Sequence, residues 1–138
     1  MERTYIMLKP DAIKRSLAGA IISRIEAKGF RIVEIKSINL SAEILQEHYA
    51  HLIEKPFYHE IEEFMMSGPV WGMIVEGENA VEAMRTMIGP TKIEDAPAGT
   101  IRGDFAFSTS ENIIHGSDSA DTANEEIQRF FGNIHPSH

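Results

Sequence analysis

The chain has 138 residues, of which 43% are hydrophobic and 25% are charged, as in an ordinary folded domain. Its formal net charge of −8 argues against a general nucleic-acid binder, which needs a basic face, but allows a small anionic ligand. The absence of cysteine excludes disulfides, zinc–cysteine sites and thiol catalysis. We expect one cytoplasmic domain over residues 1–138, without a signal peptide or a membrane span.

The first half of the chain alternates strand and helix patterns. An apolar run over residues 4–8 predicts an inner strand that ends at Lys9, because Pro10 cannot donate to a sheet. A helix is expected from an N-cap at Ser16 to residue 28, followed by a second strand over residues 30–40. Ser41 is the expected N-cap of the next helix, which packs through residues including His48.

The middle of the chain continues this alternation. Residues 57–66 predict another helix, and the apolar run Val70–Val75 predicts a strand buried on both faces. Asn79 and Glu82 have the spacing of an N-terminal capping box for a helix that ends at residue 89. This order of elements predicts an α+β fold with a ferredoxin-like βαββαβ core, in which helices pack on one face of a four-stranded antiparallel sheet.

The segment Gly89–Asn112 has little apolar periodicity, and a stretch of that length is often functional. Two β-branched residues before His115 predict a short buried strand that carries the imidazole at its end. Residues 117–119 offer N-caps for a last helix over residues 120–131, and the tail 132–138 is expected to fray.

Several polar residues interrupt the apolar pattern, among them three cations. Each one alone is more often an ordinary surface residue, and a single histidine is seldom catalytic. Together, cations clustered against an acidic background favour a small polyphosphate ligand, since lysine and arginine match phosphate oxygens. The set comprises Lys9, Tyr49, Arg85, Thr91, Arg102, Asn112 and His115.

Short strings spread from Arg3 to Phe131 resemble the nucleoside diphosphate kinase family. They are Arg3-Thr4, Lys9–Ala12, His48-Tyr49, Lys55–Tyr58, Ser67–Val70, Val75–Asn79, Pro97–Asp104 and Asn112–Ser119. The resemblance implies a long loop at a nucleotide cleft and reversible transfer of the γ-phosphoryl group from a nucleoside triphosphate to a diphosphate. The route is ping-pong through phosphorylated His115, whose neutral imidazole is nucleophilic near pH 7 and whose phosphoramidate keeps a high transfer potential.

The resemblance also assigns roles to the other site residues. Glu126 would bond the second nitrogen of His115, and Ser117 would hold Glu126. Phe57 would stack on the base, which barely distinguishes bases because every base has a π-face. The transferring phosphoryl and ribose hydroxyls would contact Lys9, Tyr49 and Asn112. The inner phosphates would contact Arg85, Thr91 and Arg102, with Mg²⁺ bridging phosphate oxygens and without a protein cage.

Two departures from the family pattern and two alternatives accompany this interpretation. Ser110-Glu111 stands where many relatives have glycine and a basic residue, which makes the pocket rim more acidic. The chain stops soon after the last helix, whereas many relatives continue with a segment that often contributes to subunit contacts. A homo-oligomer is still expected, but tetramer and hexamer both stay open. The alternatives are a nucleotide-binding regulatory module without turnover and an acyl-phosphate hydrolase. Joint presence of His115, Glu126 and Ser117 favours the kinase over both.

Overall fold

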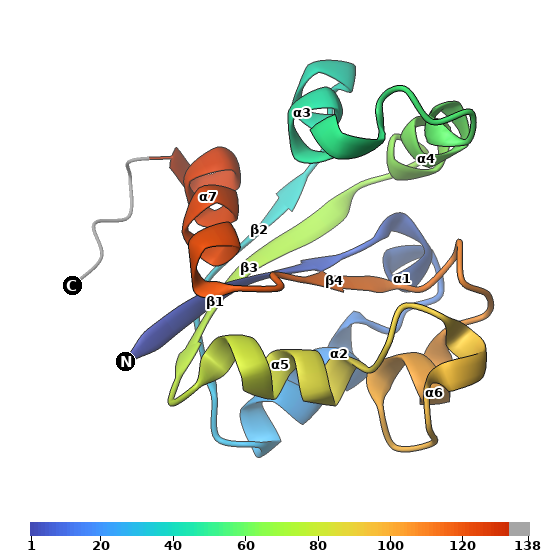
Figure 1. Cartoon of the computed structure of the whole chain (residues 1–138). Helices are drawn as coiled ribbons and strands as arrows, with labels where there is room; N and C mark the ends of the chain where they lie inside the picture. The colour runs from blue at the N-terminus through green and yellow to red at the C-terminus, as the bar shows by residue number, and fades with distance from the viewer. Residues whose placement is uncertain (133–138) are drawn as a thin grey trace.

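The structure is a computed structural model that describes residues 1–132 (Figure 1). The expected fraying of the tail therefore lies outside the described residues, except for Gly132, which directly follows the last helix. Along the chain the elements are β1 (Glu2–Leu8), α1 (Pro10–Lys14), α2 (Ala18–Ala27), β2 (Arg31–Ile38), α3 (Ala42–His48), η1 (Ala50–Leu52), α4 (Tyr58–Met65), β3 (Val70–Gly77), α5 (Ala80–Ile88), η2 (Ile93–Asp95), α6 (Ile101–Phe105), β4 (Ile114–Gly116) and α7 (Ala120–Phe131).

The four strands form one antiparallel sheet in the order β2-β3-β1-β4. β1 lies at its centre, pairing with β3 along its whole length and with the short β4 on its other side. This order confirms the predicted ferredoxin-like arrangement. β3 is buried along most of its length, as its apolar run predicts.

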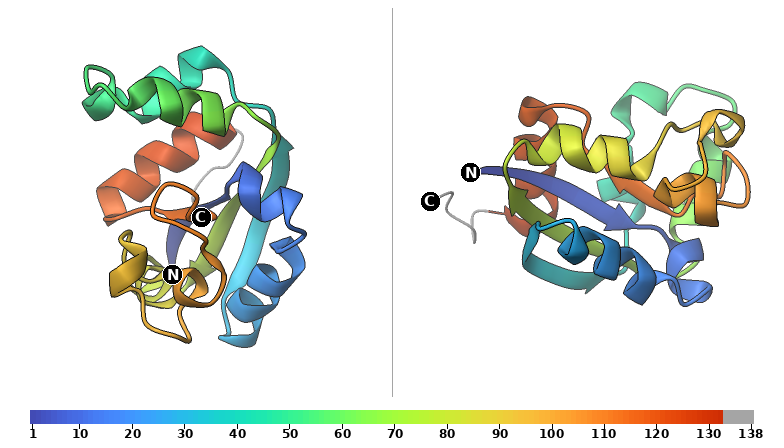
Figure 2. Two further views of the ribbon diagram at one scale, coloured as in Figure 1. Left: turned by 90° about the vertical axis from the view of Figure 1, so that its right-hand side faces the viewer. Right: turned by 90° about the horizontal axis from the view of Figure 1, so that it is seen from below.

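Helices cover both faces of the sheet, so the expectation of helices on one face was wrong (Figures 1 and 2). Side chains alternate along β1, and Ile6 and Leu8 join a core beneath α2 and α5. Tyr5 and Met7 point the other way, into a second core formed with α3, α4 and α7. Periodicity shows which side of a helix packs, but not which face of a sheet receives it.

The predicted cap of α2 at Ser16 was wrong, whereas α5 starts directly after Asn79 as predicted but without the predicted capping hydrogen bond. Ser16 has a φ of 57° and lies between α1 and α2, and the N-cap position of α2 is Leu17 and not Ser16. Asn79 has a φ of 52°, and its side chain caps nothing. In its place, the carboxylate of Glu2 accepts a hydrogen bond of 2.9 Å from the amide of Val81, which holds the start of α5 from the neighbouring strand.

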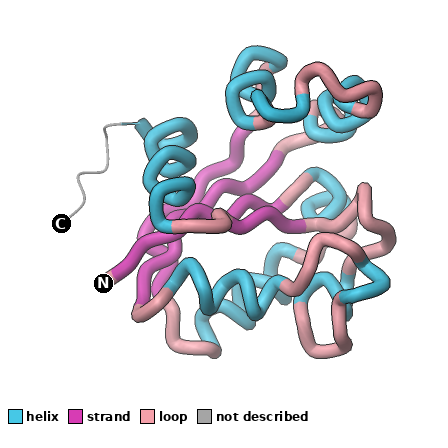
Figure 3. The backbone as a smooth tube through the Cα atoms, viewed as in Figure 1, coloured by secondary structure: helices cyan, strands magenta, loops and turns pink. Residues whose placement is uncertain are grey.

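The long segment between α5 and β4 contains two short helical pieces, η2 and α6, joined by loops (Figure 3). Its far end is unusual, because Ile113 has a φ of 63° although its side chain is buried. The carboxylate of Asp11 accepts a hydrogen bond of 3.1 Å from the Ile113 amide and holds this turn. β4 therefore starts at Ile114, one residue later than predicted, and His115 lies in its middle.

The helices of residues 1–132 are all too short or too polar to cross a bilayer.

The predicted cap at Ser41 is confirmed, and it allows a test of local stability. Its hydroxyl accepts a hydrogen bond of 3.2 Å from the amide of Ile44. We expect Ser41→Ala to lower the free energy of unfolding by about 1 kcal/mol, because a helix amide loses its partner. The same change at Ser23, exposed in the middle of α2, should be neutral or stabilising by up to about 0.5 kcal/mol. Urea unfolding of both variants measures the difference, and equal effects would contradict the capping role.

Candidate active site

β4 presents His115 to the α7 side of the sheet. Antiparallel pairing sets His115 opposite Met7 of β1, and its ring centroid lies 6.3 Å from that of Tyr5. The next residue, Gly116, faces the opposite core, where an added Cβ would come within 2.7 Å of the Ile88 side chain. The close packing of α5 beneath β4 therefore favours glycine directly after the histidine, because a Cβ here would displace the end of the Ile88 side chain.

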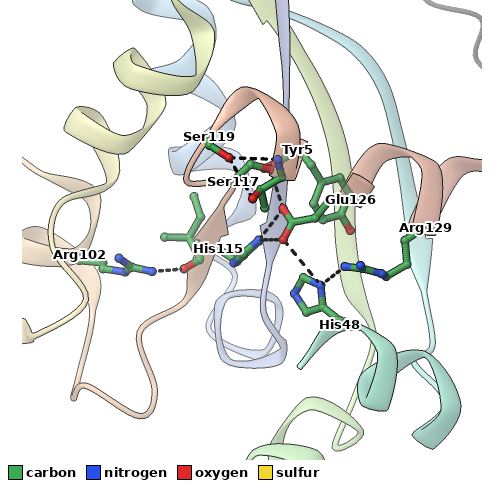
Figure 4. Close-up of polar contacts among 10 residues, drawn as sticks. Tyr5, His48, Arg102, His115, Ser117, Ser119, Glu126 and Arg129 are labelled. Atoms are coloured by element: carbon green, nitrogen blue, oxygen red, sulfur yellow. Dashed lines mark hydrogen bonds and ion pairs between the residues drawn. The ribbon is translucent and has the colours of Figure 1, made fainter. Parts of the chain in front are cut away.

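The imidazole of His115 is held from behind by one carboxylate. Its Nε2 lies 2.9 and 3.0 Å from the two carboxylate oxygens of Glu126, which is buried on α7 (Figure 4). The buried hydroxyl of Ser117 donates a hydrogen bond of 2.6 Å to the same carboxylate. Burial alone would raise the pKa of Glu126, but the hydrogen bonds and charge of its partners lower it overall. Glu126 is thus an ionised, acceptor-only partner.

This arrangement fixes the tautomer of His115. Because an ionised carboxylate cannot donate, Nε2 must carry the proton and Nδ1 must carry the lone pair. Among residues 1–132, Nδ1 has no hydrogen-bond partner, and the ring lines a cavity of about 750 Å³. The structure thus directs the ring nitrogen of His115 that carries the lone pair away from Glu126.

Lys9 and Asn112 meet at the end of β1. Pro10 begins α1, so the chain turns sharply after Lys9, whose Nζ donates a hydrogen bond of 2.9 Å to the Asn112 side chain. The side-chain amide of Asn112 in turn donates a hydrogen bond of 2.9 Å to the carbonyl of Thr109. Burial and the charge of Arg102 lower the pKa of Lys9 to about 8. A phosphate oxygen near this half-buried ammonium would be bound more strongly than by an ammonium in bulk water.

Arg102 reaches the cavity from α6, but two of its donors are already engaged. Its Nη1 and Nη2 donate hydrogen bonds of 2.9 and 2.7 Å to the carbonyls of Gly89 and Ile114. Burial, with the nearby charge of Arg85, lowers its pKa to about 10. Arg102 therefore ties the long segment to β4 and supplies a fixed positive charge to the cavity, while Arg85 is exposed and lies at its edge.

Two cavities adjoin each other and bring together most of the predicted residues. The first is lined by Lys9, Tyr49, Arg85, Thr91, Arg102, Asn112, His115 and Glu126. The second, of about 770 Å³, shares Lys9, Tyr49, Thr91 and Asn112 with the first and adds Phe57, Ser110 and Glu111. Ser117 lies behind Glu126 and lines neither cavity. Burial raises the pKa of Tyr49 to about 12, so its phenol is a donor at neutral pH.

Among the residues of the first cavity that were not singled out as site residues from the sequence are His48 and Arg129. His48 was predicted only as a packing residue of α3, and Arg129 looks like a surface cation of α7. The sequence signal that could have identified Arg129 is its spacing. Arg129 follows Glu126 by three residues and therefore lies on the same side of the helix.

The site contains one group of side chains with metal-ligand chemistry. Ligand atoms of His48, His115 and Glu126 lie within 4.8 Å of one another. However, the guanidinium of Arg129 donates a hydrogen bond of 3.0 Å to Nδ1 of His48, so a permanent positive charge occupies the position next to this ligand atom. That arrangement disfavours a cation bound directly by these three residues.

Comparison with known proteins identifies the family. The family model described as nucleoside diphosphate kinase matches residues 2–135. A nucleoside diphosphate kinase of an Exiguobacterium species is 50% identical over 97% of this chain and 96% of its own length, and the human nucleoside diphosphate kinase 3 is 48% identical over 94% and 77%. The crystal structure of the Encephalitozoon cuniculi enzyme has a TM-score of 0.95 at 47% identity, covering 100% of this chain and 95% of its own. This chain therefore belongs to the nucleoside diphosphate kinase family.

Proposed function

We propose that His115 is the residue through which this chain carries out the reaction of its family. As a nucleoside diphosphate kinase, the chain transfers the γ-phosphoryl group of a nucleoside triphosphate reversibly to a nucleoside diphosphate. The observation that supports His115 is the pair of contacts of 2.9 and 3.0 Å between its Nε2 and Glu126. They leave the lone pair on Nδ1, at the wall of a cavity lined by four cationic side chains, namely Lys9, Arg85, Arg102 and Arg129.

The two half-reactions follow from this geometry. Nδ1 of His115 attacks the γ-phosphorus, a P–N bond forms, and the P–O bond to the diphosphate breaks with its electron pair leaving on the nucleotide. The ring becomes positively charged while Nε2 keeps its proton, and the carboxylate of Glu126 stabilises that charge. A second diphosphate then attacks the phosphohistidine and restores the neutral ring. Glu126 and Ser117 stay in place throughout, so little reorganisation is needed.

We assign the nucleotide contacts by position in the two cavities. The ammonium of Lys9, the phenol of Tyr49 and the amide of Asn112 serve the transferring phosphoryl group and the ribose hydroxyls. Arg85 and Thr91 bind the inner phosphates, and Arg102 contributes mainly its fixed charge because its Nη atoms are engaged. Phe57 is 45% exposed at the second cavity, which suits a stacking surface for the base.

Magnesium fits this site as a partner of the nucleotide. Ligation by nucleotide phosphates suits a cavity whose buried carboxylate, Glu126, is already engaged with His115 and Ser117. When bound, Mg²⁺ neutralises charge on the phosphate oxygens and orients them. Lys9 and the arginines supply the remaining positive charge.

The chain is further proposed to act as one cytoplasmic domain over residues 1–138, with nucleotides as its partners and neither nucleic acid nor membrane among them. We also propose a homo-oligomer, either a tetramer or a hexamer. The edge strand β2 supports self-association, because its outer side pairs with no strand of residues 1–132 and it carries Ile35, which is 41% exposed.

Labelling of the protein tests the proposed function. Incubation with γ-labelled ATP and Mg²⁺ should give a phosphoprotein whose label is labile in acid and stable in alkali. Added GDP should discharge it as labelled GTP, and proteolytic mapping should locate it on the peptide with His115. A His51→Ala variant is the matched control, because this exposed histidine also lines the cavity and should leave the labelling unchanged.

Two outcomes would contradict the proposal. ATP that binds without labelling the protein would leave a nucleotide-binding regulatory module. A label that resists acid would place the phosphoryl group on a hydroxyl and not on an imidazole.

A further inference from the structure

A second imidazole stands against the candidate nucleophile. His48, the last residue of α3, has a side chain only 2% exposed, and its ring centroid lies 5.0 Å from that of His115 at an interplanar angle of 79° (Figure 4). Its Nδ1 lies 3.8 Å from a carboxylate oxygen of Glu126. Both imidazoles therefore direct one nitrogen towards the same carboxylate.

Arg129 fixes which nitrogen of His48 carries the proton. Its Nη1 lies 3.0 Å from Nδ1 of His48, while its Nε lies 3.4 Å from the carboxylate of Glu47. A guanidinium only donates and stays protonated at every relevant pH, so Nδ1 must accept this hydrogen bond. The single proton of a neutral His48 is therefore on Nε2, on the side of the ring away from Arg129.

His48 is neutral in the folded protein. Burial, followed by the charge of His115, lowers its pKa to about 3, in spite of the nearby carboxylate of Glu126. The approach of 3.8 Å between His48 and Glu126 is accordingly not an ion pair at neutral pH. Nε2 has no hydrogen-bond partner within residues 1–132, and His48 lines the cavity that contains Nδ1 of His115.

From this geometry we propose that the Nε2–H group of His48 donates a hydrogen bond to an oxygen of the transferring phosphoryl group, and that Arg129 acts as a positioning residue that holds His48 in the donating tautomer. The proposal rests on the proposed function of His115. Each ring is anchored on the Glu126 side by one nitrogen, so the other two nitrogens face the same cavity. One is the nucleophile and the other is an uncharged donor. Such a donor stabilises charge on the phosphoryl oxygens without repelling the charge that develops on His115.

Three substitutions at His48 separate a donor from a packing residue. His48→Phe keeps the shape of the ring without a donor, and we expect the first-order rate of enzyme phosphorylation by ATP to fall about 10- to 100-fold. Affinity for ADP should change less than about threefold, because the diphosphate lacks the group that the donor contacts. The amide of His48→Gln reaches the position of Nε2 and should recover most of the lost rate, whereas His48→Asn reaches only the position of Nδ1 and should not.

Arg129 is tested by a readout that packing alone would not change. In nitrogen-15 NMR spectra of the wild-type protein, His48 should be in the Nε2–H tautomer. Arg129→Met should mix the two tautomers and slow phosphorylation, and Arg129→Lys, which keeps a donor, should restore both. A His51→Phe variant changes a histidine of the same cavity outside the proposed contacts, and its rate should match the wild type.

The outcomes distinguish this proposal from the proposed function. A wild-type protein that forms no phosphoenzyme overturns the role of His115 itself. A wild type that is phosphorylated normally, with His48→Phe equally fast, overturns only the donor. If His48→Gln is as slow as His48→Phe although both bind ADP like the wild type, His48 acts by packing and the proposal is wrong. A wild-type Nδ1–H tautomer also overturns it.

Discussion

His115→Asn is expected to lower the rate of phosphoryl transfer by about 10⁴-fold or more, because removing a nucleophile removes the covalent route as a whole. The amide nitrogen of asparagine has no available lone pair, so no phosphoenzyme should form. The cations and the aromatic side chain proposed to bind the nucleotide lie elsewhere in the two cavities and are unchanged. Affinity for ADP should therefore stay within about threefold of the wild type.

The measurement pairs stopped-flow transfer kinetics with calorimetric titration of ADP. Protection against thermal unfolding by ADP shows that the variant is folded, since a ligand that binds only the native state stabilises it. A variant that retains more than about 1% of the wild-type rate would contradict the proposed nucleophile. Loss of ADP binding together with the rate would show instead that His115 shapes the cavity.

The main elements of the fold were predictable because their signals are local. The apolar run of β3, the serine caps of α3 and α7 and the glycine after α5 each specify an element from a few neighbouring residues. Two predictions failed at places where a distant residue holds the backbone. Ile113 is held by Asp11, 102 residues away in the chain, and the start of α5 by Glu2. No local pattern reports such a contact.

The candidate site was predictable as a set of residues but not as a geometry. Resemblance to a family identified His115, Glu126 and Ser117, and it transferred their roles one residue at a time. Only the structure reveals that each Nη atom of Arg102 donates a hydrogen bond to a backbone carbonyl. The contact between Arg129 and His48 joins α7 to α3, so it depends on the helices of one face meeting there. The sequence pattern did not establish that packing.

The second large effect on the rate of transfer is expected at Lys9, whose charge depends on pH near neutrality. Lys9→Met should lower kcat by about 10²- to 10³-fold, because the transferring phosphoryl group loses a cation held at a partly buried position. In the wild type, kcat/KM for ATP should fall as the pH rises through about 8, the pKa to which burial and Arg102 lower Lys9. Lys9→Met should lack this decline, and Lys9→Arg should move it to higher pH. The pH profiles of kcat/KM for the wild type and the two variants measure this decline. If the decline persists in Lys9→Met, it arises from the titration of another group.

Lys9→Met should raise the free energy of unfolding although it lowers the rate of transfer. The pKa of Lys9 is about 8 when folded and 10.5 as the ordinary value, so between these pH values the unfolded chain binds more protons than the folded one. The contribution of Lys9 to the free energy of unfolding is therefore unfavourable below pH 8 and is relieved as the pH rises to about 10.5. Urea unfolding should find Lys9→Met more stable than the wild type at pH 7, with the difference shrinking across this window. A variant that is slower yet more stable would mean that the partly buried lysine serves phosphoryl transfer and lowers the stability of the fold.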